Sequence, residues 1–552
     1  RAEEKWEIPL DLEWVIDQSG RLVWLQARPI TTLDKVDINE LDSRLHHDSD
    51  TLTNHNVGEM LPGAITPLTI STVVHAIDYG LRKMLTVVGV AKKVEDIPPA
   101  FCVSNYYGHL FFNMRYLYRI PHALILTDRE SIDIGICGQP LEHKDEDQFK
   151  KISLIRRLFN FVRYFSFLSS NKKARRKIDQ LARNIHFDLD KEPIVLYEEI
   201  TKQLHTLNQI MLYHYITSSY SGAMSSALFS ILKRDNDNHD AVKSLIASVL
   251  EEIDDIESAD ILYSLRRIAL LSRAARRDIA TLNIEQLLDY YENSKARVKD
   301  AYQQFLTKHG HRSVKEAELR SPGWHQDKLS LMSNIQVVLQ QKDIERIRPT
   351  QIKDNKEILL APYRGLKKKA LKTLIHNARE GCRNREYSKS RLVLAVDRFK
   401  QAYKVLATQL VSEQRLIDDD LIYFFTHEEL GRLLKSEETS LIKKALSRRR
   451  LFAEQSRLKF NHVYHGAPTP LETTSFASQV GETLRGTTLS RGKVLGKARV
   501  VLSIEDAKLL QADEIMVAGY TDIGWSPYYA IIGGLVTEVG SALSHGAVVA
   551  RE

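Results

Sequence analysis

The sequence contains few cysteines, no long apolar run and no recognisable leader. Only three cysteines occur in 552 residues, Cys102, Cys137 and Cys382, and they lie far apart without paired metal-binding spacing. No apolar run reaches the roughly 18 residues of a membrane span, and the N-terminus lacks the charged and apolar blocks of a secretion signal. We therefore predict a cytoplasmic protein with no membrane partner, while a first residue other than Met leaves a lost targeting segment open.

The excess of one charge sign is small. The 78 Lys and Arg residues stand against 71 Asp and Glu residues, which leaves a formal charge of +7. Basic clusters at 172–177, 367–369 and 448–450 could meet phosphate or an acidic surface. No nucleic-acid-binding module accompanies them, so we interpret them as solvated helix faces and predict no nucleic-acid partner. With 43% hydrophobic residues, the chain can bury several cores in roughly three or four domains.

The sequence is rich in helix-forming segments. Apolar residues recur at spacings of three and four in stretches rich in Leu, Ala, Lys, Arg and Glu. These stretches are residues 153–168, 194–215, 241–257, 284–308, 366–380 and 388–410. No fixed-period repeat accompanies them, so a solenoid is not expected. We predict a large, mainly helical region between the two ends of the chain.

His545 has the position of a histidine that accepts a phosphoryl group. A β-branched run at 535–539 leads through Gly540 to Ser541 or Ser544, either of which can cap a following helix. His545 would then lie in the first helical turn. There, partial positive charge and free N–H groups disfavour imidazolium and favour a phosphorylated, anionic ring. The ordinary alternative is a capping or surface histidine.

Two strand-like runs near the N-terminus, at 11–17 and 21–28, flank a predicted two-residue hairpin turn at Ser19-Gly20. With this turn, side-chain alternation places two cross-strand pairs on one face, Glu13 with Gln26 and Asp11 with Arg28. A carboxylate, an amide oxygen and a guanidinium then converge. Such a set suits a magnesium nucleotide, because hard oxygen ligands hold the cation while an arginine fork meets phosphate oxygens. The alternative is a surface hairpin with one cross-strand Asp–Arg pair.

Two segments that interrupt the helical pattern carry polar or flexible residues. Residues 56–69 contain Gly and Pro residues that break both helix and strand, so we predict a loop. A second segment contains His309 and His311, followed by Glu316, Glu318 and Trp324. Both histidines could serve a substrate or a metal. We favour a helix end at Gly310 with structural polar contacts.

A third such segment, residues 415–430, contains three adjacent acids, Asp418 to Asp420. Three carboxylates in a row can indicate a cation site. However, Asp residues before an apolar run, and Thr426 three residues before Glu429, match helix caps and a capping box. We therefore predict caps here.

The C-terminal segment 533–552, which includes His545, resembles the phosphohistidine signature of a known swivelling domain. That domain occurs in the superfamily of phosphoenolpyruvate synthase, pyruvate phosphate dikinase and rifampicin phosphotransferase. Upstream residues look like the same domain's other marks, in matching order: Gly486, 490–492, Gly496, 498–501 and 521–527. Segments 56–69 and 418–430 are similar to parts of rifampicin phosphotransferases and related proteins.

The N-terminal hairpin resembles the end of the superfamily's ATP-grasp nucleotide-binding domain, through residues 12–14 and 25–31. In that family the matching Glu and Gln bind metal and the Arg contacts phosphate. The resemblance therefore implies that Glu13 and Gln26 bind Mg²⁺ and that these two residues and Arg28 bind ATP.

The resemblance implies a multidomain α/β fold. Residues 1–35 would be the C-terminal end of an ATP-grasp domain, and residues 36–480 a mostly helical substrate or linker region. Residues 481–552 would be a swivelling β/β/α phosphohistidine domain, which is truncated. Because most of the ATP-grasp core and the closing strands are missing, we expect this fragment to be inactive alone.

The implied function is ATP-dependent phosphoryl transfer of the dikinase type. The β-phosphoryl group of ATP would pass to His545 with release of AMP and phosphate, and then to a small-molecule acceptor, possibly through a hydroxyl. A helical region before His545, and Gly546 where pyruvate enzymes usually have Ala, favour the rifampicin phosphotransferase arrangement. A pyruvate, water dikinase-like activity is the alternative, as is an inactive binding or scaffold protein if the truncation is natural. The oligomeric state and the acceptor stay open.

Overall fold

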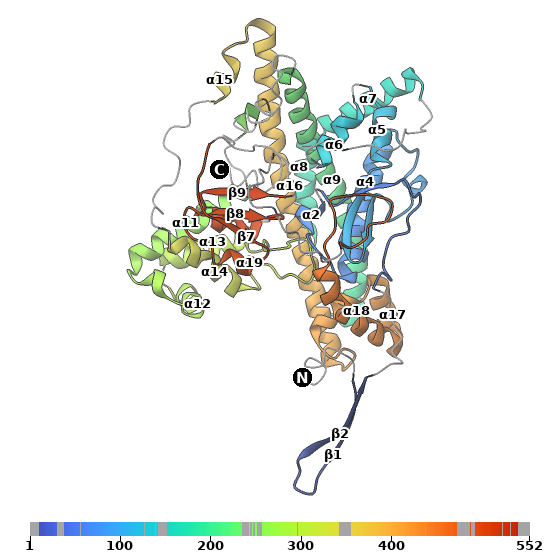
Figure 1. The fold of residues 1–552 in the computed structure, drawn as a ribbon, viewed down its shortest axis with the longest axis vertical. Coiled ribbons are helices and arrows are strands. Elements are labelled where there is room, and N and C mark those ends of the chain that lie inside the picture. The colour runs from blue at the N-terminus through green and yellow to red at the C-terminus, as the bar shows by residue number, and fades with distance from the viewer. Residues whose placement is uncertain are drawn as a thin grey trace.

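The computed structural model describes twelve longer stretches of the chain and a few single or paired residues between them. These are residues 10–29, 38–55, 57–125, 127–137, 140–141, 152–233, 242, 245–246, 249–250, 257–294, 296–341, 355–436, 438–471, 486, 492–521, 523–529 and 531–538. Most of them form helices, and three small sheets complete the fold (Figure 1). This agrees with a multidomain α/β protein in which helix predominates.

Two long helices run side by side through the molecule, α9 (Pro193–Lys233) and α16 (Gly365–Ser412) (Figure 1). Against α9 pack three shorter helices, α4 (His75–Val87), α7 (Leu154–Ser169) and α8 (Asn171–Asn184). Their apolar faces form one large core. Burial of these faces, rather than helix propensity alone, stabilises the bundle.

A second group of four helices has its own core. It comprises α11 (Glu257–Ala275), α12 (Ile284–Asn293), α13 (Ala296–His309) and α14 (Lys328–Leu339). Tyr302, Phe305 and Trp324 are buried at its centre. Two of its helices begin at side-chain caps, because Asn283 accepts from Gln286 N–H and Asp327 accepts from Ser330 N–H.

Short elements connect these groups. The remaining helices are α2 (Val57–Met60), α3 (Pro67–Thr69), the π-helix η1 (Ile70–Val74), α5 (Ile120–Ala123), α6 (Arg129–Cys137), α15 (Asn355–Leu360), α17 (His427–Lys435), α18 (Thr439–Arg457), α19 (Ile504–Ala507) and α20 (Ser526–Tyr529). The 3-10 turns are η2 (Val94–Asp96), η3 (Leu117–Arg119), η4 (Ile279–Thr281), η5 (Asp419–Phe424) and η6 (Ile523–Trp525). No helix in the described stretches has an apolar segment long enough to cross a bilayer.

The three sheets are separate. Strands β1 (Leu10–Ile16) and β2 (Leu22–Pro29) form an antiparallel hairpin that projects below the helical body in Figure 1. A four-stranded antiparallel sheet has the order β4-β5-β3-β6, from β3 (Thr51–Thr53), β4 (Val103–Tyr106), β5 (His109–Asn113) and β6 (Val463–His465). The edge strand β6 is contributed from beyond the helices, so this sheet joins the two ends of the helical region.

The third sheet is parallel, in the order β7-β8-β9, from β7 (Ala498–Val501), β8 (Ile515–Ala518) and β9 (Gly534–Thr537). Helix α20 connects it to α14 and α11. Ile523, which precedes α20, is buried in the core of the second helical group. In this structure the parallel sheet is therefore docked on that group.

Several helix predictions need correction. The separate stretches predicted at 366–380 and 388–410 are one continuous helix, α16, whereas the stretch predicted at 284–308 is two helices, α12 and α13. The loop predicted at 56–69 contains two short helices, α2 and α3. Most of the predicted helix 241–257 lies outside the described residues.

The basic cluster at 448–450 is a solvated face only in part, since Arg450 is exposed. Arg448 is buried, and its guanidinium binds both Glu40 and Glu429, with Nη2 to Glu40 Oε1 at 2.9 Å and Nη1 to Glu429 Oε2 at 2.5 Å. The chain before α4 and helix α18 are thereby held together.

Candidate functional site

The β1–β2 hairpin brings Glu13, Gln26 and Arg28 together as predicted. Glu13 lies opposite Gln26, and Asp11 opposite Arg28. Arg28 Nη2 donates to Gln26 Oε1 at 2.6 Å and lies 3.4 Å from Glu13 Oε1. The side chains of Arg28 and Glu13 are 58% and 53% exposed, so their ion pair contributes little stability. The strand register brings these three side chains together, and all three are exposed to solvent.

The turn of the hairpin differs from the prediction. Asp17 N–H donates to Arg21 O at 2.9 Å, so the loop has three residues instead of two. Gly20 closes the loop with a φ of +80°, a conformation that glycine adopts without strain. Near the turn the pairing is shifted by one residue, and a bulge at Leu25 restores the predicted partner of Glu13. The longer loop and the bulge thus compensate for each other, and Glu13 still pairs with Gln26.

The donor set of the hairpin fits magnesium and phosphate. Glu13 and Gln26 offer carboxylate and amide oxygens, which are ligands that Mg²⁺ accepts, and Arg28 offers a fork for phosphate oxygens. In this structure Arg28 holds the Gln26 amide oxygen. A cation that used this oxygen would require Arg28 to release it, and a bound phosphate would offer Arg28 a new partner. The roles of these three residues stay predictions.

His545 lies outside the described residues. The described part of its surroundings is strand β9, which runs parallel to β8 and belongs to the β-branched run predicted before the histidine. The serines predicted as caps also lie outside the described residues.

The segment from His309 to Asp327 buries an unusual set of polar side chains. Six of them are less than 9% exposed: His309, His311, Arg312, Ser313, Glu316 and Glu318. Buried polar groups need partners, and each of these side chains has at least one, although His309 Nδ1 has none among the described residues. Arg312 donates to both carboxylate oxygens of Glu316, at 2.6 and 3.1 Å. The carboxylate of Glu318 accepts from Thr66 Oγ1 and Thr69 Oγ1 in the segment around α3.

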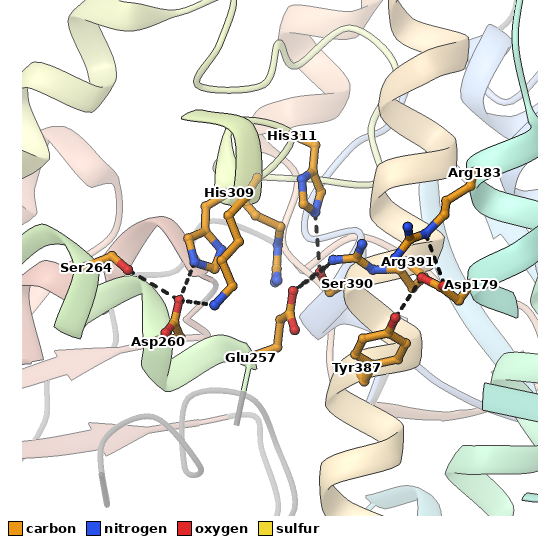
Figure 2. A network of polar contacts seen from close by, with 12 residues as sticks. Asp179, Arg183, Glu257, Asp260, Ser264, His309, His311, Tyr387, Ser390 and Arg391 are labelled. Atoms are coloured by element: carbon orange, nitrogen blue, oxygen red, sulfur yellow. Dashed lines mark hydrogen bonds and ion pairs between the residues drawn. The ribbon is translucent and has the colours of Figure 1, made fainter. Parts of the chain in front are cut away.

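Figure 2 shows how this segment is connected to the neighbouring helices. His309 Nε2 lies 2.7 Å from Asp260 Oδ2 of α11, and His311 Nε2 lies 3.3 Å from Ser390 Oγ of α16. Arg391 of α16 donates to Glu257 of α11 at 2.8 Å. The polar contacts therefore link α11, α13 and α16.

His309 and His311 make structural polar contacts in this structure, as favoured from the sequence. Burial lowers the pKa of His309 although the nearby Asp260 opposes this effect. Burial, with the charges of Arg312 and Arg391, places the pKa of His311 well below its usual value. Within the described stretches, no group of three or more His, Cys, Asp or Glu side chains could hold a metal ion.

The helix ends near His309 as predicted, but not by the predicted kind of cap. Gly310 N–H still donates to Leu306 O at 2.8 Å, and Gly310 has no left-handed backbone conformation. A Cβ at this position would clash with the backbone oxygen of Leu306 and lie 3.1 Å from His325 Cβ. The glycine is therefore needed for close packing and not for a left-handed turn.

Among the acids at 418–420, Asp418 is a cap as predicted, whereas Asp420 forms an ion pair that was not predicted. Asp418 Oδ1 accepts from Leu421 N–H at 3.0 Å. Thr426 and Glu429 form a capping box at the start of α17, with both reciprocal hydrogen bonds present. Asp420 pairs with Arg320 at 2.6 Å. Nothing in this arrangement requires a cation.

Sequence reasoning missed a histidine–aspartate pair at a cavity of about 370 Å³. His325 Nε2 lies 3.0 and 2.8 Å from the two carboxylate oxygens of Asp397, and Asp397 also accepts from Gln401 at 2.8 Å. Asp397 is buried in α16, whereas His325 is partly exposed to the cavity. The residues are 72 positions apart, so no local pattern could reveal the pair.

A second missed group consists of charges between α16 and α9. Arg385 Nη2 donates to Glu386 Oε1 at 2.8 Å, and Lys389 Nζ lies 3.7 Å from Glu316 Oε1. His214 of α9 lies beside them, with Nδ1 2.9 Å from Ser388 Oγ. Burial, followed by the charges of Lys389 and Arg385, lowers the pKa of His214 to about 3. A buried histidine with a shifted pKa beside charged side chains is a common feature of functional sites.

Two models of known protein families match this chain, one in the helical region and one in the C-terminal segment. A family model for the fourth domain of rifampicin phosphotransferase matches residues 214–386, and one for the mobile domain of PEP-utilising enzymes matches residues 510–552. Both matches support the PEP-utilising enzyme superfamily, and the chain is rifampicin phosphotransferase-like. In this rifampicin phosphotransferase-like chain, the first match covers the second helical group and part of α16. The second covers β8, β9 and His545, and the predicted family is confirmed.

Curated relatives point to the same family. Rifampicin phosphotransferases of Bacillus cereus and Bacillus subtilis are 29% and 30% identical to this chain over 290 residues, which cover 49% of the chain and 32% of each relative. The prodigiosin synthesizing transferase PigC of Serratia marcescens is 27% identical over 303 residues, covering 51% of the chain and 32% of that protein. The rifampicin phosphotransferase-like chain thus matches about a third of the length of these relatives. The predicted ATP-grasp end, domain boundaries and location stay predictions.

Proposed function

We propose that this chain is part of an ATP-dependent phosphotransferase of the dikinase type. His545 would carry the β-phosphoryl group of ATP to a small-molecule acceptor. The observation that carries this proposal is the mobile-domain match, which spans the two strands β8 and β9 and continues through the histidine. Relatives named as phosphotransferases support the reaction class. Nothing in the comparisons favours the pyruvate, water dikinase alternative.

The hairpin would serve the nucleotide end of the reaction. Glu13 and Gln26 would hold Mg²⁺, and Arg28 would contact phosphate. When bound, the cation neutralises phosphate charge, which is a large part of what phosphoryl transfer requires. The hairpin itself contributes positioning: its bulge keeps the carboxylate opposite the amide oxygen. Trp14 and Trp24 are each 55% exposed, which fits a hairpin that packs against further protein.

The acceptor would bind near α16. Two observations support this location: the charged groups Arg385, Glu386 and Lys389 have low exposure, and the segment 309–327 carries further polar groups to the same helix. The parallel sheet is docked on the helices that flank this segment. A carrier domain docked there could deliver its phosphoryl group over a short path.

The first prediction tests His545 as carrier. The full-length natural protein is incubated with ATP labelled on the β-phosphate and with Mg²⁺, and acid-labile label on the protein is measured. We expect label on the wild type and none on His545→Ala, because phosphohistidine is acid-labile and forms on this ring. His75→Ala, at an exposed position in α4, is the matched control and should label normally.

Equal labelling of His545→Ala and wild type would contradict the carrier role. Absence of label on the wild type, although ATP binds, would overturn the transferase proposal. A Lys389→Gln variant separates the two half-reactions. It should still form phosphohistidine but release its label more slowly to an acceptor that discharges the wild type.

A further inference from the structure

Helix α7 presents an apolar stripe to solvent. Six large apolar side chains of this helix are between 54% and 84% exposed: Leu154, Ile155, Leu158, Phe159, Val162 and Phe165. Their spacing of one, three and four residues places them all on one face of the helix. Contiguous exposed apolar surface of this kind marks an interaction site.

The opposite face of α7 fixes this orientation. Arg157 Nε and Nη2 donate to Leu124 O at 3.0 and 2.6 Å, and Asn160 Nδ2 donates to Ala123 O at 3.0 Å. Phe167 and Leu168 are buried in the main core. Turning the stripe inward would break these hydrogen bonds and expose both core residues. The apolar stripe is therefore held outward by the fold.

The stripe lies in a strongly basic segment. Residues 152–178 contain eight Lys and Arg residues and no Asp or Glu. Arg156 and Arg163 are exposed on α7. The first turns of α8 add four more exposed cations: Lys172, Lys173, Arg176 and Lys177. Part of this positive charge is compensated, because Lys172 lies 3.3 Å from Glu380.

The position of α7 leaves this face accessible. In Figure 1, α7 lies at the upper edge of the helical body, far from the β1–β2 hairpin and on the other side of α9 and α16 from the parallel sheet. A partner bound here would not obstruct the nucleotide hairpin or the docked sheet.

We propose that α7 and the start of α8 form a docking surface for an anionic lipid bilayer. The apolar stripe would enter the boundary between headgroups and acyl chains, while the flanking cations meet lipid phosphates. The charge of the segment favours a negatively charged surface over a second copy of this equally basic face. The surface goes beyond the proposed phosphotransferase function, and it revises the prediction that the protein has no membrane partner. It requires no membrane-spanning helix.

The proposal is tested by co-sedimentation with vesicles. We expect the chain to bind vesicles of phosphatidylcholine mixed with phosphatidylglycerol, and to bind phosphatidylcholine alone much less. Replacing Phe159 and Phe165 together by Glu should weaken binding at least about tenfold, because two large apolar contacts are lost and negative charge is added. Ile417→Glu, at a position 62% exposed outside α7, is the matched control and should bind normally.

Charge is tested separately by replacing Lys173, Arg176 and Lys177 with Gln, which should also weaken binding at least about tenfold. Binding by the wild type should fall as salt is added. Thermal unfolding followed by circular dichroism checks that each variant is folded. Equal binding to neutral and anionic vesicles, or none by the wild type, would overturn the proposal. So would a dimer in light scattering that the Phe159 and Phe165 changes dissociate, since the stripe would then bind protein.

Discussion

At the scale of single residues, His427 shows how burial sets a protonation state. Its Nδ1 lies 2.8 Å from Tyr403 Oη, and its Nε2 lies 2.9 Å from Thr201 Oγ1. Thr201 Oγ1 donates its own hydrogen to Tyr197 O, so it accepts from Nε2–H of a neutral ring. Burial lowers the pKa of His427 to about 4.

This pKa predicts a loss of stability in mild acid. Between pH 6.5 and about 4, the unfolded chain binds a proton at this histidine that the folded chain does not. The free energy of unfolding therefore falls as the pH is lowered through this window, by up to about 3 kcal/mol for this group. Other buried histidines act in the same direction, so the measurement is a difference between variants. Urea unfolding across this range should show a shallower pH dependence for His427→Gln than for the wild type.

The exposed His75→Gln serves as control and should retain the wild-type pH dependence. If the curves of His427→Gln and the wild type run parallel, protonation of His427 is not coupled to unfolding.

At the scale of elements, the long helix α16 shows why the sequence suggested a break. The segments predicted at 366–380 and 388–410 flank Gly381, a residue that disfavours helix. In the structure Gly381 lies against α9, and a Cβ there would be 3.0 Å from Ser221 Cα. Close packing of two helices thus explains the glycine, and the contact with α9 outweighs its low helix propensity.

Gly381→Val should lower the free energy of unfolding by about 1–3 kcal/mol, because the added side chain meets the backbone of α9. Gly222, in α9, is the matched control: a Cβ there meets nothing within 4 Å. Gly222→Ala should raise stability by about 0.5–1 kcal/mol through helix propensity. Denaturant unfolding of both variants measures whether the free energy of unfolding falls for Gly381→Val and rises for Gly222→Ala. A stability loss of equal size in both would show that packing against α9 is not the cause.

At the scale of the whole molecule, the docking of the parallel sheet depends on a small contact. Ile523 is buried in the core of the second helical group together with Trp324. Ile523→Ala should weaken docking by about 2–4 kcal/mol, because it leaves a cavity in this core. Hydrogen exchange should then increase in α14 and α20 and stay unchanged in α9 and α16.

Val500→Ala is the control, since Val500 belongs to the same sheet but is 64% exposed. It should leave exchange in α14 unchanged. Faster exchange in α9 and α16 of Ile523→Ala would instead indicate general destabilisation.

Local features of the fold and site could be predicted from the sequence because they depend on neighbouring residues. Helix α7 follows from apolar spacing, and the capping box of Thr426 and Glu429 follows from hydrogen bonds three residues apart. The pairing of Glu13 with Gln26 was predicted correctly, although through a turn of the wrong length. The bulge that corrected the register left no clear mark in the sequence.

The sequence by itself determined the helical character of the chain, the resemblance to its family and the residue types of the nucleotide hairpin. Only the tertiary structure decided which charged side chains are buried. It paired His325 with Asp397, enclosed Arg448 between two carboxylates, and turned the apolar stripe of α7 outward. Each of these outcomes depends on residues brought together from distant parts of the chain, because burial and electrostatic pairing are set by packing and not by local propensity.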